Sequence, residues 1–231
     1  MLLAIDTATS TASLALYDFG TRQLLAELTW QARRRQTQDL MPALQDLMRL
    51  VDLTPAAITA LAVTTGPGSF TGVRIAISAA KGMALGLPQP PQVVGIPTLS
   101  VTAAPYIELA GTAGATICAA IQAGRGRYNW AWFGGCDLLH RPVVEDHKAG
   151  TVADFAAALA ARTAMVWLVG ELSADLLDAL AAAPGVGPVV RVDSTSSLRR
   201  AGQLARLAAQ HLEAGTCDAI ETLQPLYLRN P

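Results

Sequence analysis

The 231-residue sequence has little of what disulfide-linked domains, zinc knuckles and nucleic-acid-binding surfaces require. It contains three cysteines, Cys118, Cys136 and Cys217, an odd number spread far apart along the chain. Neither a disulfide framework nor a zinc knuckle is therefore indicated. The net charge is only -1, so we expect no overall attraction to nucleic acid or to an anionic membrane. Reduced thiols are typical of the cytosol, and we expect a cytoplasmic protein.

Catalytic motifs are equally scarce. The histidines are His140, His147 and His211, and the first two flank Arg141-Pro142, which breaks any single helical face. No Gly-x-Ser-x-Gly motif places a serine nucleophile on a tight turn. We therefore expect no metal site and no hydrolytic chemistry from this chain alone.

Long uninterrupted hydrophobic helices are missing as well. Residues 82–107 carry no charge, but the prolines within them exclude a membrane-spanning helix. The first residues lack the basic region and cleavage site of an export signal. With 52% hydrophobic and 15% charged residues, the sequence predicts a globular protein with a large core.

The most distinctive segment is Gly66-Pro67-Gly68-Ser69-Phe70-Thr71-Gly72-Val73-Arg74. The pattern predicts a buried strand before it, over 60–64, and a helix after it, over 73–85. Glycines at the start of a helix can expose N–H groups to an anion, and they can equally form a tight structural turn. The spacing matches neither the P-loop nor the dinucleotide fingerprint. Both interpretations therefore stay open.

The order of predicted elements is similar in the two halves of the chain. The first half is predicted to contain strands at 2–5, 11–17 and 23–29, a helix at 37–51 capped by Thr37, a strand at 60–64, a helix at 73–85 and a strand at 92–96. The second is predicted to contain strands at 116–121, 127–133 and 141–145, then helices at 152–162, 173–182 and 197–214 with strands at 165–169 and 188–192 between them.

A three-stranded meander followed by alternating helices and strands is the order of a ribonuclease-H-like unit. Two such units in tandem predict an α/β protein of the actin, sugar-kinase and Hsp70 (ASKHA) architecture. We place the N-terminal lobe at 1–103, the C-terminal lobe at 104–215 and a C-terminal tail at 216–231. The last helix is expected to be scaffold of the second lobe.

Four segments together resemble the bacterial TsaB family, also called YeaZ. They are Ala4-Ile5-Asp6-Thr7-Ala8-Thr9, Gln36-Thr37-Gln38, the run from Gly66 to Arg74, and Pro225-Leu226-Tyr227-Leu228-Arg229. Two positions depart from the family pattern. Gln36 stands where many members have histidine, and Gln122-Ala123-Gly124-Arg125 stands where Asp-Ala-Arg is common.

The resemblance implies a part in installing threonylcarbamoyl (t6A) on adenosine 37 of tRNAs that read ANN codons. In that system a TsaD-type transferase carries the metal and the transfer chemistry, a TsaE-type protein is an ATPase, and TsaC makes the threonylcarbamoyl adenylate. This chain is then expected to be a required subunit without enzymatic activity of its own and without a cofactor, with ATP and metal on its partners. The alternatives are a stand-alone actin-fold ATPase and a glycoprotease-like peptidase.

The resemblance also implies direct partners. The two first-lobe helices are expected to bind the TsaD-type transferase and, in isolation, a second copy of the chain as a homodimer. Contact with tRNA is expected to be indirect, and none with membranes is expected. The expected partner-binding residues are Leu40, Met41, Leu44, Met48, Arg74, Ile75, Ser78 and Ala79. On pattern alone, the same broad apolar faces also suit an ordinary helix-on-sheet core.

Actin-fold ATPases hold a magnesium nucleotide between carboxylates and glycine hairpins of both lobes. The corresponding residues of the first lobe form a vestigial phosphate loop of Asp6, Thr7, Thr9, Gly66, Gly68 and Ser69. Asp6 also suits a simpler task, capping the turn after its strand. The matching strand end of the second lobe carries the neutral Gln122, a weak magnesium ligand. We therefore expect weak or absent ATP binding.

Two short segments mix features that nucleic-acid-binding proteins use. Arg33-Arg34-Arg35 is either a solvated run or a contact to tRNA phosphates within a complex. Tyr128, Trp130 and Trp132 alternate along one strand after Arg125 and Arg127, and this pattern suits base stacking or, more simply, a packed hairpin.

Overall fold

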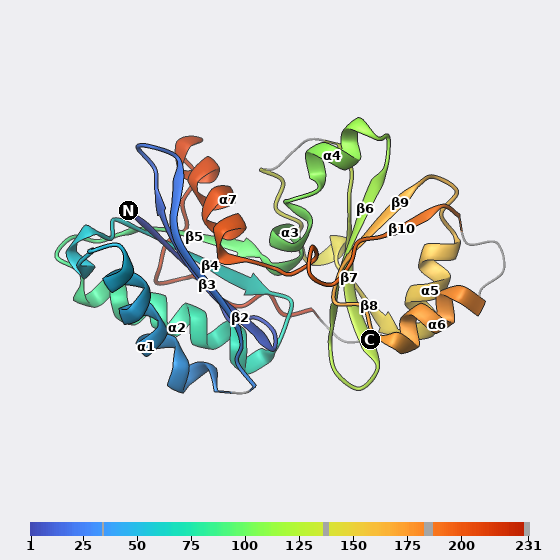
Figure 1. Ribbon diagram of the computed structural model, residues 1–231, viewed down its shortest axis with the longest axis horizontal. Helices are drawn as coiled ribbons and strands as arrows, with labels where there is room; N and C mark the ends of the chain where they lie inside the picture. The colour runs from blue at the N-terminus through green and yellow to red at the C-terminus, as the bar shows by residue number, and fades with distance from the viewer. Residues whose placement is uncertain (34, 136–138, 183–186, 229–231) are drawn as a thin grey trace. The chain divides into compact units, whose positions relative to one another are not determined.

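The computed structural model describes residues 1–33, 35–135, 139–182 and 187–228 (Figure 1). The chain forms two compact units. Unit 1 comprises 1–101 and 199–226, and unit 2 comprises 102–198 together with the residues from Tyr227 onward. Within the described ranges, no helix is both long enough and apolar enough to cross a bilayer.

Unit 1 is built on a five-stranded mixed sheet in the order β3-β2-β1-β4-β5. The strands are β1 (Leu2–Asp6), β2 (Thr11–Asp18), β3 (Gln23–Gln31), β4 (Ala60–Gly66) and β5 (Gln92–Pro97). β1 pairs antiparallel with β2 and parallel with β4. Every residue of β1 and β4 is buried, as their nearly continuous apolar sequences predict for strands covered on both faces.

Helices cover both faces of this sheet. α1 (Gln36–Leu50) and α2 (Phe70–Gly86) lie on one face, and α7 (Ala201–Glu213) lies on the other (Figure 1). Leucines and valines of β1, β2 and β4 alternate inward to meet α1 and α2 in one hydrophobic core. A short 3-10 helix, Pro55–Ala57, precedes β4.

Unit 2 repeats the arrangement with mostly shorter elements. Its strands are β6 (Thr116–Gln122), β7 (Arg127–Phe133), β8 (Lys148–Thr151), β9 (Val166–Gly170) and β10 (Val189–Arg191), in the order β10-β9-β6-β7-β8. Its helices include α4 (Ile107–Thr112), α5 (Val152–Ala160) and α6 (Ala174–Ala182), with a 3-10 turn at Val144–Asp146. α3 (Thr98–Ala103) spans the boundary between the units.

The two sheets have the same strand order when each is counted from its own first strand. In both, the first strand pairs antiparallel with the second and parallel with the fourth. The prediction of two tandem ribonuclease-H-like lobes, in the ASKHA class, is confirmed.

The last helix was expected in the second lobe, and this is wrong, because 199–226 belong to unit 1. α7 packs on the unit 1 sheet, where the Ala201 N–H donates to Ser13 Oγ at 2.9 Å and the Gly202 N–H to Glu27 Oε1 at 2.8 Å. The tail expected at 216–231 likewise belongs to unit 1 as far as Leu226. These contacts join segments from the two ends of the chain. Hydrophobic periodicity within a short stretch of sequence cannot predict such contacts.

Three local predictions also differ from the structure. The strand expected at 141–145 is instead β8, because Pro142 and the 3-10 turn occupy the earlier segment. Thr37 does not cap α1, which begins at Gln36 after an N-cap residue, Arg35, that makes no side-chain bond. α3 and α4 were not predicted, and they occupy the segment after β5 for which no element was expected.

Candidate functional site

Asp6, at the end of β1, is the centre of a buried polar network in unit 1. Its Oδ1 accepts hydrogen bonds from the Ala8 N–H and from Thr64 Oγ1, each at 2.9 Å. Its Oδ2 pairs with Nε of Arg199, whose Nη2 donates to Thr9 Oγ1 at 3.0 Å. The Asp6 side chain is 1% exposed and that of Arg199 is 4% exposed, so the charges neutralise each other away from water.

The glycine loop packs directly against the turn that follows β1. A Cβ atom on Gly68 would lie 2.3 Å from the Ala8 carbonyl oxygen, and one on Gly72 would lie 2.1 Å from that of Thr7. The Ser69 N–H donates to the Ala8 carbonyl at 2.6 Å, and the Gly72 N–H donates to Ser69 Oγ at 3.2 Å. The glycines therefore serve the close approach of two backbone segments, and N–H groups that could bind an anion are used internally.

Gly66, the first glycine of the loop, faces the C-terminal segment instead. Its φ is +107°, and a Cβ atom there would lie 3.1 Å from the Leu226 carbonyl oxygen. The Leu226 N–H donates to the Thr65 carbonyl at 2.7 Å, and Asp218 Oδ2 accepts from the Gly95 N–H at 2.7 Å. Two of the segments that carry the family resemblance thus meet in space.

The six residues expected to form a vestigial phosphate loop do not all share one site. Asp6, Thr7, Thr9, Gly68 and Ser69 lie together, whereas Gly66 contacts the C-terminal segment. Their arrangement does not suit a magnesium nucleotide, because Asp6 is already paired with a guanidinium and the Ser69 and Gly72 N–H groups are bonded to protein atoms. Arg199 was not predicted, since it lies 193 positions from Asp6 and belongs to no motif.

The equivalent strand end in unit 2 is open to solvent. Residues 122–126, which link β6 to β7, are all exposed. The Gln122 N–H donates to Glu171 Oε2 at 3.0 Å. A carboxylate is therefore present at this strand end, and it belongs to the residue that follows β9. Within the described parts of the chain, no group of three acidic, histidine or cysteine side chains is placed to bind a metal ion.

Two side chains of unit 2 with catalytic potential, His147 and Cys118, are buried. His147 Nδ1 bonds to the Val143 carbonyl at 2.8 Å, and burial lowers the pKa of His147. Burial also raises the pKa of the Cys118 thiol well above its usual range, so the thiol is inert. Cys136 lies outside the described residues.

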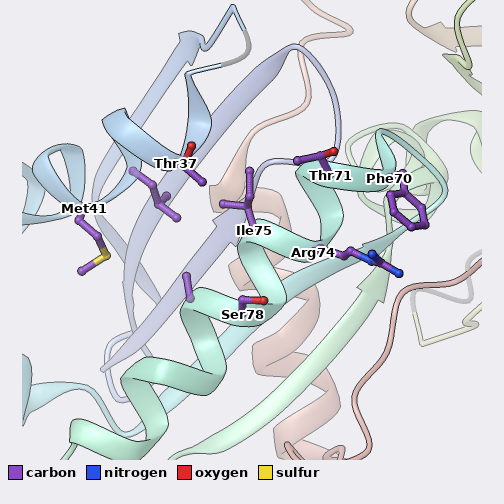
Figure 2. Close-up of a pocket in the computed structure, with 9 residues that line it drawn as sticks. Thr37, Met41, Phe70, Thr71, Arg74, Ile75 and Ser78 are labelled. Atoms are coloured by element: carbon purple, nitrogen blue, oxygen red, sulfur yellow. The ribbon is translucent and has the colours of Figure 1, made fainter.

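A groove with a volume of about 550 Å³ separates the first turns of α1 and α2 (Figure 2). Its lining residues are Thr37, Leu40, Met41, Phe70, Thr71, Arg74, Ile75, Ser78 and Ala79. Six of the eight residues expected to bind a partner are therefore brought together here. Phe70 and Thr71 were missed because they were read as part of the glycine loop, whereas α2 begins at Phe70.

The other predicted residues of α1 do not reach this groove. Leu44 and Met48 are 3% and 7% exposed and pack in the core of unit 1. Leu40 is also buried, although it is one of the residues that line the groove. Met41 and Phe70, at 45% and 58% exposed, are the large apolar side chains that the groove presents to solvent.

The start of α2 holds an ordered cation. Ser69 caps the helix, and the Arg74 guanidinium carbon lies 3.7 Å from the centroid of the Phe70 ring. Figure 2 shows the Arg74 side chain extended toward that ring. Stacking of this kind restricts a long side chain to one position.

The arginine run is only partly described. Arg33 and Arg35 are exposed, Arg35 forms an ion pair with Asp39 at 3.3 Å, and Arg34 lies outside the described residues.

The aromatic residues of β7 form a packed hairpin. Tyr128 and Trp130 are 1% and 5% exposed, and their rings lie 5.2 Å and 4.7 Å from that of Phe155. These buried rings are core residues and are not a platform for stacking bases.

Comparisons with known proteins agree with one another. Residues 30–159 match the model of a family described as TsaD, tRNA N6-adenosine threonylcarbamoyltransferase. The Escherichia coli K12 tRNA threonylcarbamoyladenosine biosynthesis protein TsaB is 32% identical, and the alignment covers 99% of this chain and 94% of that protein. Its Haemophilus influenzae counterpart is 37% identical over 47% of this chain and 44% of its own length. The structure of YeaZ from Pseudomonas aeruginosa superposes with a TM-score of 0.76 at 26% identity, covering 98% of this chain and 99% of that one.

Proposed function

Because this chain belongs to the TsaB family of tRNA threonylcarbamoyladenosine biosynthesis proteins, also named YeaZ, we propose that it is a non-catalytic subunit that binds and organises a TsaD-type transferase. In this role it supports threonylcarbamoylation of adenosine 37 in tRNAs that read ANN codons. The docking site is the groove between α1 and α2.

The observation that carries this proposal is the contrast between the groove and the Asp6 network. The network has its hydrogen-bonding groups paired within unit 1. The groove instead presents Met41 and Phe70 to solvent between two helices. An exposed apolar groove of this kind suits a helix of a partner protein.

The remaining partners follow from the same proposal. A TsaE-type ATPase joins the complex, tRNA is contacted indirectly, and a second copy of the chain covers the groove when the transferase is absent. ATP and metal are held by the partner subunits, and the complex is cytoplasmic. This chain then contributes a binding surface, and the transferase contributes the catalytic residues.

An omission assay tests the proposal. Threonylcarbamoyladenosine formation on tRNA is measured with purified TsaC, TsaD and TsaE, with and without this chain, and ATP hydrolysis by the chain alone is measured in parallel. We expect product only when the chain is present and no ATP turnover without partners. Equal product in its absence would refute the proposal, and magnesium-dependent turnover by the chain alone would favour a stand-alone ATPase.

A groove variant locates the docking site. Ser78 is exposed on α2 and lines the groove, so Ser78→Arg should fill the groove without disturbing the core. We expect this variant to lose co-elution with the transferase. Ala153→Arg, at a helical position on α5 of unit 2 that is also exposed, is the matched control and should bind normally. Binding by both variants would place the interface elsewhere.

A further inference from the structure

The edges of the two sheets differ in how they are protected from pairing with another chain. The outer side of β5 is covered by the C-terminal segment, where the Asp218 N–H donates to the Val93 carbonyl and Asp218 Oδ2 accepts from the Gly95 N–H, each at 2.7 Å. In unit 2 the edge strands β8 and β10 have four and three residues and carry Lys148 and Arg191. A covering segment, a short strand and a basic side chain are devices that keep sheet edges from pairing.

β3, the other edge strand of unit 1, lacks all of these devices. It has nine residues, none of them Lys, Arg or Pro, and none is buried. Its exposed apolar side chains are Leu24, Leu25 and Leu28, at 47%, 37% and 38%. Its one charged residue is Glu27, whose Oε1 accepts from the Gly202 N–H of α7 at 2.8 Å. Among the residues that the structure describes, no strand pairs with the outer side of β3.

The chemistry of this edge specifies an extended strand as its ligand. The outer side of an edge strand presents backbone N–H and C=O groups, and another strand satisfies them by adding to the sheet. A second copy of the chain supplies such a strand, because a two-fold axis sets two identical edges antiparallel and makes the contact self-complementary.

The charges along β3 also favour a second copy. Like charges directly opposite each other would oppose a symmetric pair, but the one carboxylate of β3 is already bonded to α7. Arg22, just before the strand, is paired with Glu213 at 3.0 Å. Two β3 strands can therefore bring their leucines together without a row of unpaired like charges between them.

We infer that β3 is a contact surface between two copies of this chain, whose five-stranded unit 1 sheets join edge to edge into one sheet of ten strands. No residue of β3 lines the groove between α1 and α2, so the two surfaces are separate. The inference goes beyond the proposed function and does not depend on it.

The test measures self-association of the Ser78→Arg chain, in which the groove is closed to a second copy. Analytical ultracentrifugation at about 5 µM and about 200 µM should show a dimer whose share rises with concentration. Adding Leu28→Lys places a lysine from each copy at the paired edges and should weaken dimerisation about tenfold or more. Leu109→Lys, at a leucine of α4 that is 60% exposed, is the matched control and should leave dimerisation unchanged.

Hydrogen exchange shows whether the contact is strand pairing. The β3 amides that do not bond to β2 should exchange more slowly at the higher concentration. Circular dichroism checks that Leu28→Lys is folded, and Leu25→Lys is the second variant, because Leu25 has no partner residue in the pairing of β2 with β3.

Three results would each overturn the inference. They are a Ser78→Arg chain that stays monomeric at about 200 µM, a dimer that neither lysine variant weakens, and β3 amides that exchange equally at both concentrations. Leu28→Lys in the otherwise unchanged chain should still bind the transferase, so failure of the β3 contact is distinguishable from failure of the proposed function.

Discussion

Units 1 and 2 share a strand order and differ in what surrounds the end of their first strand. In unit 1 the turn after β1 is buried beneath the glycine loop and linked to Arg199. In unit 2 the turn after β6 is exposed along its whole length. The helices differ as well, since α1 and α2 have 15 and 17 residues and leave a groove between them, whereas α5 and α6 have 9 each. The same topology therefore leaves a groove between two long helices in one unit and carries shorter helices in the other.

The largest effect should come from Arg199, which has no equivalent at the strand end of unit 2. Arg199→Met leaves the buried Asp6 carboxylate without its cation, and we expect a loss of about 3–5 kcal/mol of unfolding free energy. Urea unfolding followed by circular dichroism measures the loss. The double variant Asp6→Asn, Arg199→Met should be more stable than the single one. Glu171→Gln in unit 2 should cost less than about 1 kcal/mol, and a similar cost for Arg199→Met would remove the contrast between the units.

Truncation of a core leucine should lower the unfolding free energy by a similar amount in both units, whereas truncation of a groove residue should hardly change it. Leu44→Ala in α1 and Leu159→Ala in α5 remove buried leucines, and each should cost about 2–5 kcal/mol by thermal or urea unfolding. Met41→Ala, one turn before Leu44, should change stability by less than about 0.5 kcal/mol and weaken binding of the transferase. If Met41→Ala destabilised the fold as strongly as Leu44→Ala, Met41 would belong to the core.

Alanine substitution of a glycine should cost more stability in the glycine loop of unit 1 than in the exposed turn of unit 2, and this difference should be more modest. At Gly68 an added methyl group overlaps the Ala8 carbonyl, and Gly68→Ala should cost about 1–3 kcal/mol. At Gly124, where φ is +74° and no atom lies within 4 Å, Gly124→Ala meets only backbone strain of about 1 kcal/mol. Denaturation midpoints of the two variants give the comparison. Equal midpoints would show that the loop moves away from Ala8 at little cost.

The smallest effect concerns pH and unit 2. Burial favours the neutral form of His147 in the folded state, so its folded pKa is lower than the unfolded value of 6.5. The unfolded chain then binds more protons as the pH falls below about 6.5, and stability should decrease over that window and be fully present above it. Urea unfolding at pH 7.5 and pH 5.5 measures the decrease. His147→Gln should reduce it, and an unchanged pH dependence in that variant would assign the effect to other groups.

Sequence patterns predicted most of the order of elements, with α3 and α4 missed, and they predicted much less of the contacts between distant segments. Apolar β1 and β4 and amphipathic α1 are local signals, and they were predicted within a few residues. β8 has only four residues, Lys-Ala-Gly-Thr, and no alternation that a strand prediction could use.

The site residues likewise include some that local patterns predict and others that depend on contacts between distant segments. Periodicity identified the apolar faces of α1 and α2, but it could not separate Met41, which is exposed, from Leu44, which is buried, because both lie on one broad face. The pairing of Asp6 with Arg199 depends on the path of the chain through unit 2 and back, and no local pattern encodes it.

The return of α7 to unit 1 has a consequence for biosynthesis. A growing chain normally completes its N-terminal part first. Here the segment 199–226, which supplies Arg199, α7 and the partner of Gly66, is made last. Unit 2 is inserted within unit 1 in sequence, so it can reach its full set of strands on the ribosome while unit 1 still lacks one helical layer. The groove between α1 and α2 is therefore part of a complete unit 1 only after 199–226 have been made.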